Sequence, residues 1–106
     1  MIARIWYGWT TPENADAYQA LLKTEIFPWI AGKKIAGFRR IELLRGPAGE
    51  EVEFATIMWF DSMAAIKAFA GKDYETSVVR PDAHALLKRY DPRSRHYEVV
   101  EEGVAD

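Results

Sequence analysis

The stretch Glu51-Val52-Glu53-Phe54-Ala55-Thr56-Ile57-Met58-Trp59-Phe60 decides the fold, because its apolar side chains fall on two opposite sides. Successive side chains of a β-strand point to opposite faces of the sheet. One face of this predicted strand takes Val52, Phe54, Met58 and Phe60, and the other takes Ala55, Ile57 and Trp59. An antiparallel sheet with one face in water alternates polar and apolar residues. This strand therefore predicts a sheet that is covered on both faces.

The segment Ile2 to Trp9 predicts a first strand of the same kind, since it is rich in β-branched and aromatic residues. One of its faces carries Ala3, Ile5, Tyr7 and Trp9, and the other carries Ile2, Arg4 and Trp6. Two more strands are expected over Phe38 to Arg45 and over Arg95 to Val100. The run Gly46-Pro47-Ala48-Gly49 predicts the turn of a hairpin that joins the second and third strands.

A long helix is expected after the first strand. Thr10 and Thr11 offer capping hydroxyls, and Pro12 suits the first helical position. Apolar residues then recur at steps of three and four from Ala15 to Trp29. Pro28 is expected to end or bend this helix.

A second helix is expected after the third strand, over Met63 to Ala70. Asp61 or Ser62 would cap it, and Gly71 would close it where a left-handed residue is favoured. A further helical stretch is expected over Asp82 to Arg89, after the break at Arg80-Pro81. The order of elements is therefore β-α-β-β-α-β.

The composition indicates one compact domain spanning residues 1–106, with an acidic tail over about 101–106 that is expected to fray. The hydrophobic fraction of 49% argues against disorder, and a net charge of −2 argues against a dedicated nucleic-acid binder. The chain has no cysteine, and no apolar run approaches the ~20 residues that cross a bilayer. Because no signal peptide is recognisable, we expect a cytoplasmic protein without membrane partners.

These elements predict an α+β, ferredoxin-like fold with a four-stranded antiparallel sheet. Two helices cover only one face of such a sheet. Leaving about 400 Å² of apolar surface in water on the other face would forgo at most roughly 10 kcal/mol. We therefore expect a homodimer in which the sheets of two copies stack face to face.

Several segments resemble the antibiotic biosynthesis monooxygenase family. They are Met1-Ile2-Ala3-Arg4-Ile5-Trp6, Met58-Trp59-Phe60-Asp61-Ser62, Ala65-Ile66-Lys67-Ala68-Phe69-Ala70-Gly71 and His96-Tyr97-Glu98-Val99. The resemblance extends from Met1 to about Val100 and implies a dimeric α/β barrel. The family includes cofactor-free oxygenases that act on aromatic polyketides and quinols, enzymes that degrade haem, and proteins without a known role.

The resemblance implies a cofactor-independent monooxygenase that oxidises a small aromatic substrate without metal or flavin. Such chemistry needs a flat apolar slot, a base for the phenolic proton and donors for the oxyanion. The candidate catalytic residues are His96, Arg4 and Trp59, with His84 as an alternative base. The candidate substrate-binding residues are Tyr7, Trp9, Phe69 and Tyr74.

Other interpretations of these residues remain open. The aromatic residues could be core or dimer-interface residues, Arg4 could form an ion pair with Glu98, and His96 could be structural. The protein could also be a binding or stress-response module without turnover, or a purely structural dimer. Haem degradation is disfavoured, because Tyr7, Phe69 and the region of Val79 depart from the pattern of that branch.

Overall fold

Five antiparallel strands form one sheet in this computed structural model, which describes residues 1–105. Strand β3 lies between β2 and β1, and β4 and β5 both pair with β1. The strands are β1 (Ile2–Thr10), β2 (Phe38–Ala48), β3 (Glu51–Phe60), β4 (Arg89–Tyr90) and β5 (Arg95–Glu98). The predicted α+β, ferredoxin-like class is confirmed, with one strand more than expected.

The additional strand arises because the last strand is interrupted. Arg89 pairs in register with Trp9, whereas Arg95 pairs with Ile5, and the chain leaves the sheet around Asp91-Pro92. The helical stretch that was expected to reach Arg89 accordingly ends at Leu86. A two-residue strand carries too few residues to show a period of two.

The helices are α1 (Pro12–Leu21), the π-helical turn η1 (Leu22–Ile26), α2 (Phe27–Gly32), α3 (Met63–Ala70) and α4 (Pro81–Leu86). The starts of α1 and α3 follow the predicted capping. Thr11 accepts a hydrogen bond from the amide of Asn14, and Ser62 accepts one from the amide of Ala65. Gly71, with φ of 90°, ends α3 as expected.

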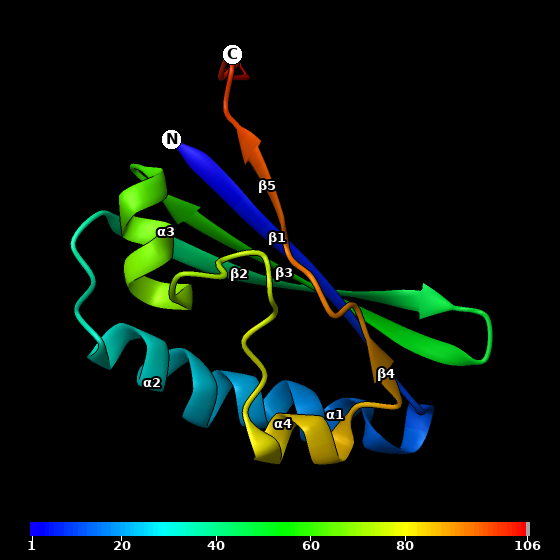
Figure 1. The fold of residues 1–106 in the computed structure, drawn as a ribbon. Helices are drawn as coiled ribbons and strands as arrows, with labels where there is room; N and C mark the ends of the chain where they lie inside the picture. Colours follow the sequence, from blue (N-terminus) through cyan, green and yellow to red (C-terminus); the bar gives the residue numbers. More distant parts are fainter. Residues whose placement is uncertain (106) are drawn as a thin grey trace.

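Pro28 was expected to end or to bend the long first helix, and the helix does not end there. Pro28 lies in the first turn of α2, directly after the π-helical turn η1. Proline lacks an amide hydrogen and is tolerated in the first turn of a helix. The wide turn thus lets the chain continue as a second helical segment, and Figure 1 shows α1 and α2 following each other below the sheet.

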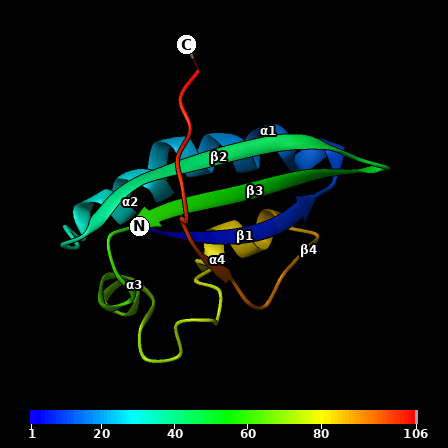
Figure 2. The same ribbon diagram turned by 90° about the horizontal axis from the view of Figure 1, so that it is seen from above.

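The helices pack on one face of the sheet (Figures 1 and 2). On this face, which we call the covered face, Phe54 and Phe60 are fully buried. Phe54 meets the ring of Tyr18 from α1 edge to face, with ring centres 4.8 Å apart. Phe60 packs with Ile66 from α3.

The opposite face of the sheet, which we call the open face, has no helix packed on it. Its apolar residues include Ile5, Ile57 and Trp59, which are half-buried, and Leu44, which is 45% exposed. The two apolar faces predicted from the alternation in β3 are therefore present. No helix within residues 1–105 is long and apolar enough to cross a membrane.

Candidate functional site

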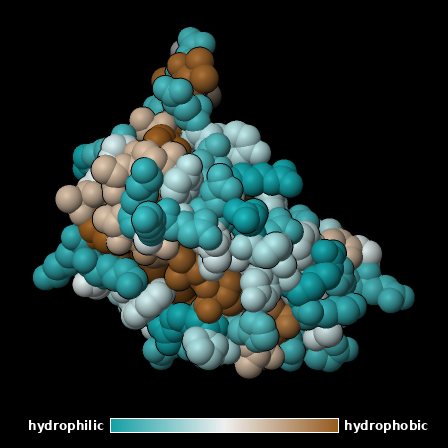
Figure 3. All heavy atoms as spheres, viewed as in Figure 1, coloured by the Kyte–Doolittle hydropathy of each residue, from teal (hydrophilic) through white to brown (hydrophobic). Residues whose placement is uncertain are grey.

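A cavity of about 70 Å³ lies between the covered face of the sheet and the helices. Figure 3 shows apolar surface on this side, over the segment that runs down into α4. The cavity's apolar walls come from η1, α2, the sheet, α3 and the segment before α4. The residues involved are Leu22, Ile26, Ile30, Ile41, Met58, Phe69, Val78 and Val79.

Arg4 is the most unusual residue of this cavity. It comes from the middle of β1, is 3% exposed, and forms no ion pair with any carboxylate of residues 1–105. Its Nη1 donates to the carbonyl oxygen of Tyr74, and its Nη2 donates to that of Thr76 at 3.2 Å. Its guanidinium carbon lies 5.7 Å from the ring centre of Phe69. Burial lowers the pKa of Arg4 to about 10, so the side chain stays cationic at neutral pH.

His96 is the third polar partner of Arg4. The two residues face each other in the register of β1 and β5, and Nε2 of His96 lies 2.9 Å from Nη1 of Arg4. Because guanidinium only donates, Nε2 is the acceptor and the ring proton is on Nδ1. Burial and the charge of Arg4 lower the pKa of His96, while Glu75 opposes this shift more weakly. His96 is thus favoured in its neutral form.

The ion pair with Glu98, one of the interpretations of Arg4, does not form. Glu98 pairs in register with Ile2, two residues from Arg4, and its side chain is exposed. The carbonyl groups of the 71–80 loop take the place of the carboxylate. These carbonyls could not be foreseen, because the loop has no periodic pattern that fixes its path.

Three hydroxyl-bearing residues also line the cavity: Tyr18, Thr56 and Ser94. Burial raises the pKa of Tyr18, so its hydroxyl stays protonated. Arg80 lines the cavity too, but its Nε and Nη2 both donate to the carboxylate of Asp82. Among the described residues, neither a carboxylate nor a histidine lines the cavity. Groups of three potential metal ligands are likewise absent from residues 1–105.

The solvent side of the cavity is its least buried wall. Trp29 is 37% exposed and lies between two cations, with Lys33 at 4.4 Å and Arg80 at 5.1 Å from its ring. Val78, which also lines the cavity, is 42% exposed. Ligand pockets usually measure roughly 300–1,000 Å³. A ligand with fused rings therefore requires this wall to move outward.

Four of the predicted site residues lie together. Arg4 and Phe69 line the cavity, His96 contacts Arg4, and the ring of Tyr74 lies 5.3 Å from that of His96. His96 and Tyr74 also line a broad hollow on the outer surface, which Arg4 does not line. The alternative base His84 is exposed on α4 and does not line the cavity.

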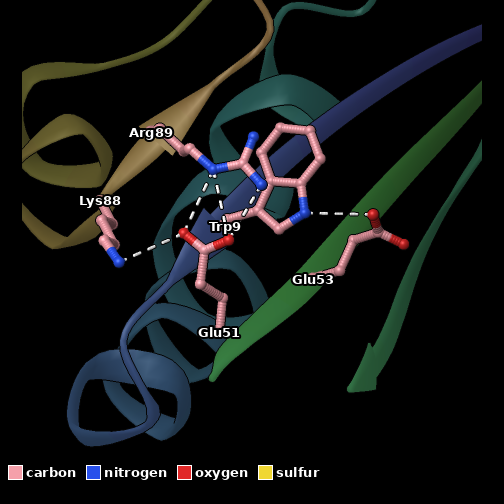
Figure 4. A network of polar contacts seen from close by, with 5 residues as sticks. All are labelled: Trp9, Glu51, Glu53, Lys88 and Arg89. Atoms are coloured by element: carbon pink, nitrogen blue, oxygen red, sulfur yellow. Dashed lines mark hydrogen bonds and ion pairs between the residues drawn. The ribbon is translucent and has the colours of Figure 1, made fainter. Parts of the chain in front are cut away.

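The other three predicted residues, Trp59, Tyr7 and Trp9, are on the open face and do not line the cavity. Trp59 donates its indole N–H to Glu42 at 2.7 Å. Figure 4 shows Trp9 between Arg89 and Glu53: its ring lies 3.8 Å from the Arg89 guanidinium, and its indole N–H donates to Glu53. Because side chains alternate along a strand, these three residues lie on the opposite face of the sheet from Phe69. The predicted slot that combined all of them with Phe69 is therefore wrong.

Sequence reasoning missed Trp6, Tyr18 and Met58 as cavity residues. Trp6 shares the strand face of Arg4, which was a usable signal, and its indole N–H donates to the carbonyl of Asp91. Tyr18 lies on the apolar stripe of the first helix, which was assigned to the core alone. Met58 is opposite Arg4 in the register of β1 and β3.

No protein-family model and no curated protein sequence matches the chain. Several solved structures do. A putative antibiotic biosynthesis monooxygenase from Bacillus cereus has a TM-score of 0.64 at 12% identity, covering 100% of this chain and 97% of its own. A monooxygenase from the gene ActVA-Orf6 of Streptomyces coelicolor, in complex with nanaomycin D, has a TM-score of 0.65 at 13% identity, covering 99% and 91%.

The chain has the fold of these monooxygenase structures. A dimeric ferredoxin-like protein from an uncultured marine organism shares it, with a TM-score of 0.62 at 12% identity and coverage of 98% of both chains. MhuD, solved with two manganese protoporphyrin IX molecules per active site, also shares it, with a TM-score of 0.59 at 22% identity and coverage of 99% and 100%. No described histidine lines the cavity of this chain, and Nε2 of His96 is bound to Arg4.

Proposed function

We propose that this chain oxidises a small aromatic, quinol- or polyketide-like molecule with molecular oxygen. The observation that carries the proposal is the apolar cavity with the buried guanidinium of Arg4 in its wall. The fold it shares with monooxygenases supports the reaction class, although a fold alone does not assign a chemistry.

The reaction would convert an activated ring CH₂ group, as in an anthrone, into a carbonyl. The substrate supplies the four electrons that reduce O₂, one oxygen atom forms the new carbonyl, and the other leaves as water with the two hydrogens. The step begins when the substrate loses a proton to solvent water and forms an oxyanion, and a proton taken back from solvent completes the water that leaves. A buried cation such as Arg4 stabilises that charge strongly, because the surroundings exclude water.

The residues would divide this work. Arg4 holds the oxyanion, and the apolar side chains of Phe69 and Met58 flank the ring system. His96 acts as a positioning residue, because its Nε2 accepts from Arg4 and is therefore occupied. Trp59, Tyr7 and Trp9 have no role in this cavity in the proposal, since they lie on the open face.

The test is oxygen uptake by the purified protein with a panel of anthrones and naphthoquinols. We expect uptake above the buffer rate with at least one substrate, and a loss of about tenfold or more in Arg4→Met. Arg39→Met is the matched control, because it removes the same charge from an exposed ion pair with Asp61. Uptake at the buffer rate with every substrate would contradict the oxidation.

A second candidate is a binding module without turnover. It is favoured by the lining of the cavity, where the described residues include no carboxylate or histidine to accept a proton. Isothermal titration calorimetry with the same panel separates the two functions. Saturable binding without oxygen uptake would support the module, and uptake would exclude it.

We also propose that the open face binds a second copy of the chain. Half-buried Ile57 and Trp59 and exposed Leu44 form its apolar surface, and a solved structure of the same fold is described as dimeric. A homodimer would cover this surface on both copies at once. Sedimentation of the wild-type chain and of Ile57→Gln tests it.

A further inference from the structure

The guanidinium of Arg4 has hydrogen-bond donors that the protein does not use. A guanidinium carries five N–H donors and no acceptor. Tyr74, Thr76 and His96 take three of them, two from Nη1 and one from Nη2. Within the part of the chain that the structure describes, the Nε hydrogen and the second Nη2 hydrogen have no acceptor.

These two donors are the pair that other arginines of this chain use to bind a carboxylate. Nε and Nη2 of Arg39 bind the two oxygens of Asp61, and Arg80 binds Asp82 in the same way. Arg89 uses Nε and Nη2 to bind Glu51. Such forks have the spacing of two oxygens that share one negative charge. Arg4 is the buried arginine in this comparison, and no carboxylate of the described residues binds its Nε and Nη2.

A buried cation without a counter-charge is unfavourable, and the partners of Arg4 offset this only in part. Two are neutral carbonyl oxygens, and the third is a histidine that is favoured in its neutral form. The surroundings thus keep Arg4 in place without neutralising it. An anion that enters the cavity would complete the site and replace no protein contact.

The walls of the cavity limit the shape of that anion. Phe69 lies beside the guanidinium, and Ile41 and Met58 come from the sheet below. These surfaces suit a flat ring. We infer that the cavity takes an aromatic anion that carries two neighbouring oxygen atoms, an aromatic carboxylate being the simplest, and that Nε and Nη2 of Arg4 bind those oxygens.

This inference deepens the proposed function and rests on it for the aromatic nature of the ligand. It also fits a cavity that has no proton acceptor among the described residues. A ligand that is already ionised in water needs no base for its binding. Arg4 then selects the charged form and fixes the edge of the ring that carries the two oxygens.

The test uses 1-hydroxy-2-naphthoate and its methyl ester as probes, because they share the ring and differ in charge. Binding is measured by isothermal titration calorimetry and by quenching of tryptophan fluorescence at pH 7.5. We expect the wild-type chain to bind the carboxylate at least about tenfold more tightly than the ester. Arg4→Met should bind both probes within about twofold of each other, and Arg39→Met should keep the wild-type preference.

Arg4→Lys serves as the second variant, in case Arg4→Met does not fold. It keeps the charge but lacks the planar fork, so it should lose most of the preference for the carboxylate. A wild-type chain that binds the two probes equally would overturn the inference without any variant. An Arg4 variant that folds and keeps the full preference would overturn it as well.

The two proposals fail separately. Carboxylate-selective binding through Arg4, without oxygen uptake on any substrate, leaves the anion site standing and removes the oxidation. Oxygen uptake that is equal for neutral and ionised substrates and unaffected by Arg4→Met leaves the oxidation standing but removes both the anion site and the role of Arg4 in the reaction.

Discussion

The buried arginine in the middle of the covered face and the arginines at the surface of the molecule have different kinds of partner. On the open face and at the surface, the arginines in ion pairs have carboxylate partners, as Arg40 has with Glu42 and Arg89 with Glu51. On the covered face, Arg4 is buried and bound to carbonyl groups and a neutral histidine. Exposed ion pairs contribute little to stability, because water screens them. The buried cation is therefore the one whose charge can act strongly on a ligand.

The faces also differ in how their apolar residues are covered. Phe54 and Phe60 are fully buried by the helices of the same chain. Ile57 and Trp59 are half-buried and have no helix above them. The covered face should thus determine the stability of a single chain, and the open face its association. The four predictions below test this division.

The largest effect is expected for Phe54→Ala. This change removes a fully buried ring that packs on Tyr18, and it should lower the free energy of unfolding by about 3–5 kcal/mol. Ile57→Ala on the open face should cost less, with a loss that depends on protein concentration. Urea unfolding at two protein concentrations measures both. Equal losses that do not depend on concentration would remove the distinction between the faces.

A smaller effect is expected for Ile57→Gln, which places a polar side chain on the open face. We expect wild-type chain to sediment with the mass of two copies at low micromolar concentration, and the variant to dissociate at least about tenfold more readily. Ala20→Gln, on the exposed side of α1, is the control and should leave the mass unchanged. A monomeric wild-type chain would contradict the proposed dimer.

The N-terminal cap of α3 should contribute a smaller amount to the free energy of unfolding. Ser62→Ala removes the acceptor for the amide of Ala65 and should lower the free energy of unfolding by about 1 kcal/mol. Thr24→Ala is its control, because the Thr24 hydroxyl only donates back to the carbonyl of Ala20. Thermal unfolding followed by circular dichroism compares them. An equal loss in both variants would argue against the capping role.

The smallest effect concerns pH. Burial and the charge of Arg4 lower the pKa of His96 below its ordinary value of 6.5. As pH falls, His96 is therefore protonated in the unfolded chain at a higher pH than in the folded chain. Stability should therefore decrease between pH 6.5 and the lower pKa of the folded chain, and this contribution should vanish above pH 6.5. His96→Gln should reduce the decrease, measured as the urea midpoint at pH 7.5, 6.5 and 5.5.

His84→Gln, on the exposed side of α4, is the control for that series and should follow the wild-type curve. If His96→Gln and the wild-type chain lose the same stability on acidification, His96 does not reach Arg4 in solution. The assignment of His96 as a positioning residue would then be wrong.

Much of the fold could be predicted because it depends on local rules. The period of two in β3 separated Phe54 from Ile57, and the hydroxyls of Thr11 and Ser62 marked helix starts. Only part of the site could be predicted. Alternation tells which residues share a face but does not tell which face the helices cover, and so Trp59 was placed beside Phe69. The partners of Arg4 in the 71–80 loop depend on tertiary packing that no short pattern encodes.

The π-helical turn at Leu22–Ile26 determines which side chains of α2 point toward the cavity. A turn of this kind holds about one residue more than a regular α-helical turn would. Because the wide turn takes up that residue, Ile30 and Trp29 line the cavity, whereas the same sequence wound as a regular α-helix would turn them about 100° away. The width of one turn thus decides whether α2 shelters the cavity beside Arg4.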